Sequence, residues 1–538
     1  MSDPASFYKV FFPAVPVTAQ VQSSGFPFIM NIKALSRLSL VPVALSGQLA
    51  FAGNPAKPNV VIFLVDDMGP MDTSVPFITD KDGTPHRYPL NDWYQTPNME
   101  RLARVGVRFS NFCAQSVSSP SRASLMTGQN AARHRTTNWI RSESDNRCDY
   151  GPRDWNWQGI KRSEYTLARL MKDAGYKTIH VGKAHFGPHR SEGEFPENIG
   201  FDVNIAGSSI GEPGSYKGEN GYGYIKGTYS RAVPGLAKYH GTDTFLTEAL
   251  TLEAIGEIDR SVEEGEPFFL YMSHYAVHNP FEIDKRFESH YLADSSKSRA
   301  AVGYATLVEG MDKSLGDIMD HLNEIGEAEN TLIIFMGDNG GDAPLGPARG
   351  WASSAPLRGK KGSEYEGGMR VPCIIGWASP SSRNASQKRL PVKKGGVSTQ
   401  VCTIMDVYPT LASLTGTPVP ADHPVDGQDL SRLLSGKPDT SREEIFMCHF
   451  PHQHNGSYYT TYRDGAWKLV YYYNPEHPET PSHVLFNLED DPFETADLSA
   501  ERPDVARKLI GDMIARLKRE NAAYPVDFEG KTVLPRID

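Results

Sequence analysis

Cysteines are few in this 538-residue sequence, and no two of them form a close pair. The sequence contains five: Cys113, Cys148, Cys373, Cys402 and Cys448. An odd number in so long a chain argues against a disulfide framework, and the absence of a Cys-x-x-Cys pair argues against a structural zinc site. We therefore expect these side chains to be mostly buried free thiols.

Long basic runs and internal repeats are also missing. The net charge is −10, and the lysines and arginines are scattered along the chain. Proteins that bind nucleic acid usually carry a basic patch or stripe, so nucleic acid is not an expected partner. An acidic protein that acts on an anionic substrate must instead concentrate positive charge locally. Lys, Arg and His close to acidic metal ligands would meet this need.

A short apolar stretch, residues 38–52, lies near the N-terminus and is too short for a typical membrane span. Lys33 and Arg37 precede it, and it ends in Ala50-Phe51-Ala52. This pattern predicts a secretory signal, and hence an exported protein, periplasmic or secreted, with no membrane span in its mature form. Because the signal does not begin at the chain start, Met30 is an alternative start; a disordered tail or an anchor helix are alternative interpretations.

Apolar strands alternate with helices between residues 59 and 336. The expected strands are 59–65, 177–181, 268–272 and 331–336, and the expected helices are 97–105, 166–174, 244–262 and 304–322. Nearly unbroken apolar strands are typical of strands that are buried on both faces. The alternation predicts an α/β fold in which a mostly parallel sheet is sandwiched by helices.

After about residue 430 the pattern changes. Residues 444–450 and 466–473 resemble strands with hairpin spacing, and residues 504–521 carry one apolar helical face. This part predicts a smaller antiparallel sheet with one packing helix. We expect an N-terminal extension with a signal peptide (1–52), a main α/β domain (53–430) and a C-terminal α+β subdomain (431–538).

Polar side chains follow the expected strands at the point where each strand ends. These are Asp66-Asp67, Gly182-Lys183, Ser273-His274 and Asp338-Asn339. Ligands of such sheets bind beyond the carboxyl ends of the strands, so we expect these residues to converge. Carboxylates that lie together repel each other, and a divalent cation relieves the repulsion. Oxygen donors favour calcium or magnesium over zinc; a helix-capping role is the alternative for Asp66-Asp67.

The segment Ser118-Ser119-Pro120-Ser121-Arg122, followed by Thr127-Gly128, stands at an expected helix start, where backbone amides favour an anion. An ordinary capped helix start is one interpretation. The segment also resembles the type I sulfatase signature, in its Ser-type variant. The resemblance implies that a formylglycine-generating maturation enzyme oxidises Ser118 to formylglycine. Cys113 lies five residues too early for that role.

Three further segments resemble the same family, in the family's order. Residues 175–187 resemble the second sulfatase signature and carry Lys183 and His185, with Ala184 where the family usually has an aromatic residue. Residues 273–281 resemble the segment with a further active-site histidine, which maps to His278. Residues 357–372 resemble the segment with a second catalytic lysine, Lys361. In that segment Lys360 stands where the family commonly has glycine. Near the C-terminus, residues 486–492 resemble the family's tail segment.

The resemblance implies an alkaline-phosphatase-like fold and a division of roles. Calcium, in preference to magnesium, would be held by five residues: Asp66, Asp67, Ser118 as formylglycine, Asp338 and Asn339. Arg122 would stabilise the ionised hydrate of the aldehyde, and Lys183 and Lys361 would hold sulfate oxygens. His278 would protonate the leaving alcohol, with Lys361 as its helper or rival. His185 would take the proton that releases sulfate.

The expected substrate is a sulfated carbohydrate, because exported Ser-type members resemble bacterial polysaccharide-degrading enzymes. Residues 133–139 and 449–455 are rich in polar and aromatic groups and are expected to line a sugar pocket, with ordinary loop packing as the alternative. Two rival functions remain open on the sequence. One is a phosphate mono- or diesterase of the same superfamily, and the other is a carbohydrate-binding pseudoenzyme in which Ser118 is never matured.

Overall fold

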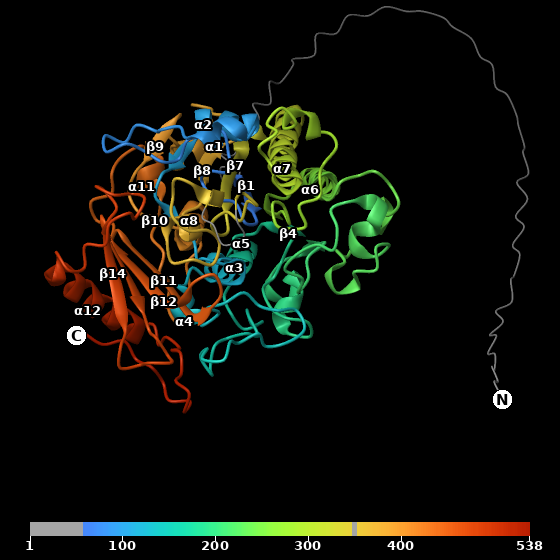
Figure 1. Ribbon diagram of the computed structural model, residues 1–538. Helices are drawn as coiled ribbons and strands as arrows, with labels where there is room; N and C mark the ends of the chain where they lie inside the picture. The colour runs from blue at the N-terminus through green and yellow to red at the C-terminus, as the bar shows by residue number, and fades with distance from the viewer. Residues whose placement is uncertain (1–56, 347–351, 538) are drawn as a thin grey trace, which may run out of the picture. The chain divides into compact units, whose positions relative to one another are not determined.

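Eight strands form the central sheet of the computed structural model, which describes residues 57–346 and 352–537 (Figure 1). Their order is β5-β4-β6-β1-β7-β8-β2-β9. They are β1 (Asn59–Val65), β2 (Val107–Phe109), β4 (Lys177–Gly182), β5 (Val203–Ile205), β6 (Phe268–Ser273), β7 (Thr331–Gly337), β8 (Cys373–Trp377) and β9 (Gly396–Ser398). Only β8 runs antiparallel to its neighbours, β7 and β2. The predicted mostly parallel sheet is therefore confirmed.

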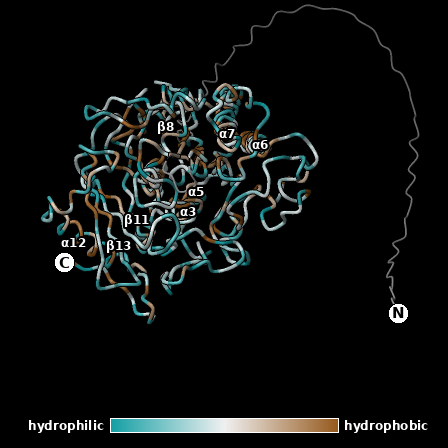
Figure 2. Tube along the Cα trace, in the orientation of Figure 1, coloured by the Kyte–Doolittle hydropathy of each residue, from teal (hydrophilic) through white to brown (hydrophobic). Residues whose placement is uncertain are grey.

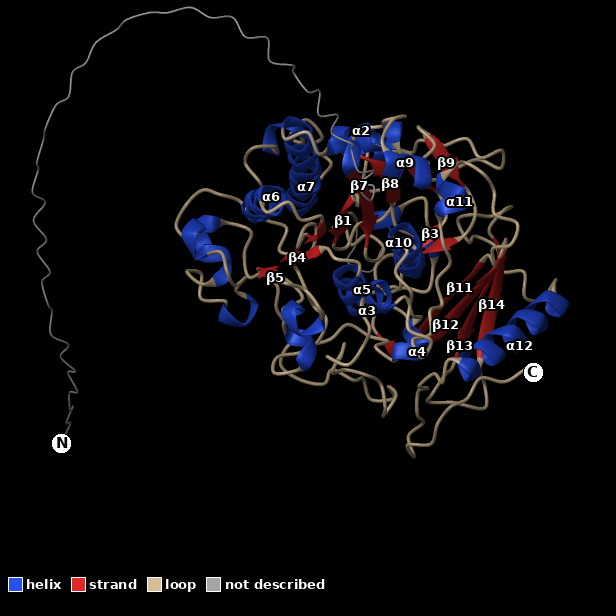
Figure 3. Cartoon of the chain, turned by 180° about the vertical axis from the view of Figure 1, so that it is seen from behind, coloured by secondary structure: helices blue, strands red, loops and turns tan. Residues whose placement is uncertain are grey.

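Helices cover both faces of this sheet. On one face lie α2 (Pro97–Val105), α6 (Leu246–Glu263) and α7 (Arg299–Glu324), and on the other lie α3 (Ser118–Thr127), α5 (Leu167–Asp173) and α10 (Val407–Thr415). Figure 3 shows α6 and α7 side by side. Hydrophobic stretches coincide with the strands and with helices such as α6, whereas the surrounding loops are mainly hydrophilic (Figure 2).

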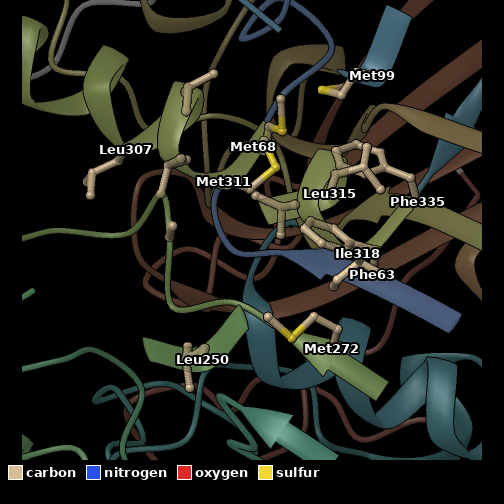
Figure 4. Close-up of a cluster of buried hydrophobic side chains, with 14 of the residues drawn as sticks. Phe63, Met68, Met99, Leu250, Met272, Leu307, Met311, Leu315, Ile318 and Phe335 are labelled. Carbon is tan, nitrogen blue, oxygen red and sulfur yellow. The ribbon is translucent and has the colours of Figure 1, made fainter. Parts of the chain in front are cut away.

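The alternation of side chains along β1 explains why both faces need a helical cover. Val61, Phe63 and Val65 pack into the core on the side of α7, whereas the alternate residues of the strand pack on the side of α3. All seven residues of β1 are buried. Figure 4 shows the first core, in which Leu315 and Ile318 of α7 lie beside Phe63 of β1 and Phe335 of β7, with Met311 next to Met68. Packing on both faces thereby sets the position of the strand ends.

Most predicted elements occur within two residues of their expected bounds. Helix α2 begins with Pro97 directly after Thr96 and ends at Gly106, because proline suits the first helical position and glycine suits the end. Helix α5 begins after Thr166, whose side chain accepts a hydrogen bond from the backbone N–H of Arg169. Helix α7 is longer than the predicted 304–322 and starts at Arg299, capped by Ser298.

The C-terminal sheet is antiparallel, as predicted, but its strand count and pairing differ from the sequence expectation. It contains β11 (Ile445–Gln453), β12 (Ser457–Asp464), β13 (Trp467–Tyr472) and β14 (Ser482–Asn487) in that order. The predicted hairpin between residues 444–450 and 466–473 is wrong, because β12 lies between the two and pairs with both. Helix α12 (Pro503–Arg519) packs on this sheet (Figure 3).

The remaining α-helices and strands are short. They are α1 (Pro89–Trp93), α4 (Ala131–His134), α8 (Glu366–Met369), α9 (Ala385–Arg389), α11 (Ser431–Leu434) and the two-stranded pair β3 (Phe112–Cys113) and β10 (Cys402–Thr403). All five cysteines are free, and only Cys148 is partly exposed. Within the described ranges, no helix combines the length and apolarity needed to cross a membrane. The predicted signal region lies outside the described residues, and the predicted domain bounds stay a prediction.

Candidate active site

Acidic side chains from two neighbouring strands meet at one edge of the sheet. Asp66 and Asp67 follow β1, and Asp338 and Asn339 follow β7, which pairs with β1 along its whole length. The carboxylates of Asp66, Asp67 and Asp338 are buried, and one oxygen of each lies within 4.8 Å of the others. Asp67 adopts a left-handed backbone conformation, with φ 58°, and its N–H donates to Asp338 Oδ1 at 3.1 Å.

Ser118 joins this cluster from the first residue of α3. Its Oγ lies 2.9 Å from Asp66 Oδ1 and 3.1 Å from Asn339 Oδ1. Lys183 Nζ lies 3.4 Å from the same Oγ. The side chain is buried, and the free amides of the first turn of α3 favour negative charge at this position. The structure therefore brings Ser118 into contact with two of the other predicted metal ligands, Asp66 and Asn339.

Arg122 lies one helical turn after Ser118 and is completely buried. Its Nε donates to Asp338 Oδ2 at 2.9 Å, and its Nη1 donates to Ser273 Oγ at 2.7 Å and to the Lys183 carbonyl at 3.0 Å. Its Nη2 lies 3.8 Å from Asp66 Oδ1 and has no hydrogen-bond partner among the described residues. A buried donor without a partner leaves room for a further anionic acceptor at this point.

Two lysines from different loops reach the carboxylates. Lys183 Nζ lies 2.6 Å from Asp66 Oδ2, and Lys361 Nζ lies 2.7 Å from Asp67 Oδ2. Burial favours a raised pKa for Asp66, but Lys183 and the other cations hold that pKa below its ordinary value. Burial lowers the pKa of Lys183. For Lys361 burial acts in the same direction, but the attraction of Asp67 raises its pKa overall.

The two predicted histidines lie at different depths. His278 follows β6, with Nε2 3.5 Å from Asp67 Oδ2 and Nδ1 3.8 Å from Glu212 Oε2. His185 is buried, and its Nε2 donates to the Ile140 carbonyl at 2.7 Å. Burial, followed by repulsion from Lys183, holds the pKa of His185 well below its ordinary value. His185 is therefore a neutral ring whose Nδ1 has no hydrogen-bond partner in the described part of the chain.

A cavity of about 620 Å³ opens above this cluster. Ser118, Lys183, His185, His278 and Lys361 all line it. Its outer wall consists of Trp139, Ile140, Arg141, Ser142, Glu143, Ile210, Gly211, Glu212, Ser230, Arg231, Asn279, Asp342, Lys360, His454 and Asn455. The volume lies in the range of small-molecule sites, about 300–1,000 Å³, and is much larger than a sulfate group alone needs.

The two segments predicted to line a sugar pocket contribute only their ends. Trp139, His454 and Asn455 line the cavity. Arg133 instead forms an ion pair with Asp426 at 2.6 Å, and the side chains of His449 and His452 are buried, bonded to the Ala523 carbonyl and to Thr137 respectively. For most of these residues the alternative interpretation, ordinary packing, is what the structure shows.

The loop residues of the outer wall were missed in the sequence. Glu212 and Arg231 lie in the long connection between β5 and α6, and Arg141 lies between α4 and α5. No strand end or capping pattern marks these positions. Their charges alone are a weak signal, because exposed Glu and Arg are common in loops.

The donor set fits a hard divalent cation. It consists of oxygens only, from the buried carboxylates of Asp66, Asp67 and Asp338, with Asn339 Oδ1 and Ser118 Oγ beside them. Oxygen donors of this kind are what calcium and magnesium prefer. Burial raises the pKa of Asp338, and repulsion from Asp66 raises it further. A bound cation would offset that repulsion.

The fold and this site together define an ester hydrolase of the alkaline-phosphatase-like class. Residues 58–417 match the family model described as Sulfatase, and residues 361–522 match the model described as N-sulphoglucosamine sulphohydrolase, C-terminal. The chain belongs to the sulfatase family, and it is therefore an enzyme that hydrolyses sulfate esters.

Individual relatives support this assignment. The N-acetylgalactosamine-6-sulfatase of Mus musculus is 32% identical over 75% of this chain and 71% of its own length. A sulfatase of Formosa agariphila is 28% identical over 90% of this chain and 93% of its own. Among solved structures, Ps i-CgsB in complex with k-i-k-neocarrahexaose shares the fold with a TM-score of 0.65 at 24% identity, covering 86% of this chain and 93% of that one.

Proposed function

We propose that this sulfatase removes sulfate from a carbohydrate, a sulfated polysaccharide or its oligosaccharides, with formylglycine formed from Ser118 and a calcium ion. The observation that carries the proposal is the position of Ser118 Oγ, 2.9 Å from Asp66 Oδ1 and 3.4 Å from Lys183 Nζ. An ordinary buried serine needs neither a carboxylate nor an ammonium group beside its hydroxyl, so these two charged neighbours support a chemical role for residue 118. The export signal and the maturation enzyme are part of the same proposal.

The charges around Ser118 suit an anionic ester. Three cations face three carboxylates: Arg122 pairs with Asp338, Lys183 with Asp66, and Lys361 with Asp67. Without a metal, the positive and negative charges of these six side chains are equal in number. A divalent cation held by the carboxylates and Asn339 would make the cluster positive and would polarise a sulfate oxygen. A positive, buried cluster attracts the sulfate group of the substrate and stabilises charge that develops on its oxygens.

The matured residue would supply a nucleophilic hydroxyl and a second hydroxyl on the same carbon. Arg122 would stabilise negative charge at residue 118, because its Nη2 is buried, points toward Asp66 and lacks a hydrogen-bond partner among the described residues. Lys183 and Lys361 would hold the sulfate oxygens as point charges. The convergence of these side chains supports the assignment, and their roles are proposals.

Two proton transfers complete the reaction. His278 lines the cavity beside Asp67, and we assign to it the protonation of the leaving alcohol, with Lys361 as its helper or rival. His185 is neutral, with its Nδ1 free to accept a proton because Nε2 donates to Ile140. We assign to His185 the removal of the proton that lets sulfate depart.

The carbohydrate assignment is supported by the cavity and by the relatives. The cavity is large enough for a saccharide and combines an indole ring, Trp139, with charged groups such as Arg141 and Glu143. The relatives include an N-acetylgalactosamine-6-sulfatase, and the neighbour Ps i-CgsB was solved with a neocarrahexaose. For this chain, the sugar and the sulfated position are open to experiment.

The test is a parallel assay of the matured enzyme on nitrophenyl sulfate, nitrophenyl phosphate and a panel of sulfated mono- and disaccharides. Desulfation of one or more saccharides, with little phosphate release, is the expected result. A clear preference for the phosphate would support the phosphatase alternative. A peptide-mass measurement at Ser118 detects the loss of two hydrogens that formylglycine formation requires; an unmodified serine in an inactive protein would support the pseudoenzyme alternative.

A further inference from the structure

Arg141 differs from the other cationic side chains that line the active-site cavity. Lys183 and Lys361 contact the metal-site carboxylates. Lys360 pairs with Asp342 at 2.8 Å, and Arg231 pairs with Glu212 at 2.6 Å. Arg141 is an exposed residue that lines the cavity. Among the described residues, no carboxylate lies within ion-pair distance of its guanidinium. Its charge is therefore available to a ligand.

The backbone on the N-terminal side of Arg141 is tied to the catalytic residues. The Ile140 N–H donates to Ser119 Oγ at 3.0 Å, next to Ser118, and the Ile140 carbonyl accepts from His185 Nε2 at 2.7 Å. Residue 140 is buried. Any ligand bound to residue 118 therefore lies at a fixed position relative to this segment.

The C-terminal side is held as firmly. The Ser142 carbonyl accepts from the His189 N–H at 2.7 Å, and Ser142 Oγ lies 2.7 Å from Ser209 Oγ. Asn146 bridges the segment itself, because its Oδ1 accepts from the Arg141 N–H at 3.1 Å and its Nδ2 donates to the Trp139 carbonyl at 2.9 Å. A side chain on such a fixed backbone loses little freedom when it binds.

Trp139 orients the guanidinium of Arg141. The guanidinium carbon lies 5.6 Å from the centre of the indole ring, within the range of a cation–π contact. This contact leaves the N–H donors for a second partner, because no group among the described residues accepts a hydrogen bond from the Arg141 guanidinium. Arginine binds sulfate-like and carboxylate groups with two parallel hydrogen bonds from these donors.

We propose that Arg141 recognises a second anionic group, a sulfate or a carboxylate, carried by the same sulfated saccharide whose ester is cleaved. This inference rests on the proposed function, because it takes the substrate to be a sulfated saccharide with its scissile group at residue 118. The preferred substrate is then at least doubly anionic. Glu143 lines the same cavity and forms no ion pair in the described part of the chain. Its negative charge would repel an anionic group of the substrate that lay beside it.

Binding is measured in a Ser118→Ala background, so that no turnover interferes. The probes are matched saccharides that carry one sulfate, two sulfates, or one sulfate and one carboxylate, titrated by calorimetry. We expect the background protein to bind at least one doubly anionic probe about tenfold or more tightly than the singly sulfated one. Adding Arg141→Gln abolishes this advantage but leaves the affinity for the singly sulfated probe within about twofold, and Arg141→Lys keeps part of the advantage.

Arg153→Gln is the matched control, because it removes the same charge from an exposed arginine of the same connection that does not line the cavity. It should keep the full advantage. The inference is overturned if no doubly anionic probe binds better, if Arg141→Gln weakens all probes equally, or if Arg153→Gln has the same effect. The two doubly anionic probes distinguish a sulfate from a carboxylate as the second group.

The proposed function is tested separately by turnover of the same saccharides by the matured wild-type enzyme. Selective binding through Arg141 without any desulfation would refute the function and leave the binding role intact. If the enzyme desulfates singly and doubly anionic saccharides with equal kcat/KM and binds them with equal affinity, the role of Arg141 is refuted and the proposed function stands.

Discussion

The hydroxyl oxygen of Ser118 lies 2.9 Å from Oδ1 of Asp66, although 52 residues separate them in the sequence. Ser118 begins a helix on one face of the sheet, and Asp66 follows the strand β1 in its centre. Their contact joins the segment that resembles the maturation signature to the carboxylates that can hold a metal. The proposed chemistry depends on this junction.

Replacement of Ser118 by alanine is expected to abolish turnover, because residue 118 then has no side-chain hydroxyl that can be oxidised to the aldehyde. Metal binding should partly survive, since the Asp66, Asp67 and Asp338 carboxylates are unchanged. Activity and metal content of the purified variant, by assay and elemental analysis, check both parts. Wild-type turnover in this variant would refute the assignment of the nucleophile.

Removal of the metal with a calcium-selective chelator is expected to abolish activity and lower the unfolding temperature, and calcium should restore both better than magnesium does. Three buried carboxylates without a cation repel one another. A ligand that binds only the native state at a hundredfold excess over its Kd stabilises by about 2.7 kcal/mol. Calorimetry and assays before and after calcium return provide the measurement. Full activity in a protein shown to be free of metal would contradict this prediction.

The identity of the general acid can be read from leaving-group dependence. With His278→Ala, turnover of a sugar sulfate should fall by a factor of about 10²–10⁴, because a sugar alkoxide leaves poorly without a proton. Nitrophenyl sulfate should lose much less, since nitrophenolate needs no proton. The same pair of assays on Lys361→Ala is the comparison. If Lys361→Ala shows the selective loss and His278→Ala does not, then Lys361 is the acid.

Lys468 of β13 holds two glutamates at the junction between the C-terminal sheet and the segment that carries Lys361. Its Nζ lies 2.7 Å from Glu494 and 3.0 Å from Glu366, and all three side chains are buried. Lys468→Met leaves the buried Glu494 without its cation, whereas Glu366 keeps Arg370 at 2.8 Å. The variant should lose about 3–5 kcal/mol of stability.

Lys508→Met is the control for Lys468. Lys508 pairs with Asp464 and Asp512, but its side chain is 63% exposed, and exposed pairs contribute about 0–1 kcal/mol. Denaturant unfolding of both variants gives the comparison. Equal losses of stability would show that burial of the Lys468 cluster has no special cost.

Asp72 makes stability depend on pH. Burial raises its pKa to about 7, although the Gly69 N–H and the Tyr304 hydroxyl donate to it and partly offset the shift. Between the ordinary carboxyl value of about 4 and this pKa, the folded state holds a proton that the unfolded state has lost. Stability from this group is therefore complete below about pH 4 and is lost as the pH rises through about 7.

Asp72→Asn should remove this dependence, because an amide is neutral at every pH. Relative to the wild type, the variant should be more stable at pH 8 than at pH 5, by a difference of at most about 2.7 kcal/mol, which is two pH units at about 1.36 kcal/mol each. Unfolding temperatures at the two pH values supply the measurement. A variant whose difference from the wild type is the same at both values would refute a raised pKa for Asp72.

The sequence alone predicted those features that depend on local patterns. The strand at 59–65 and the start of α2 at Thr96-Pro97 each depend on residues that are adjacent in the sequence. Both occur where expected. The strand-end rule brought Asp66 and Asp338 to one edge, because the carboxyl ends of parallel strands share that edge. Local patterning failed at β12, because its tyrosines and threonines stand in neighbouring pairs and do not alternate between apolar and polar side chains.

Only the tertiary structure decided which groups face one another. The sequence does not show that Lys183 pairs with Asp66 and Lys361 with Asp67. Nor does it show that Arg231 pairs with Glu212 while Arg141 has no carboxylate partner among the described residues. These relations depend on loops whose paths are set by distant packing, and no periodicity records such paths. The sequence therefore determined the kind of chemistry and the edge of the sheet where it is placed, whereas the fold determined the charge that each side chain meets.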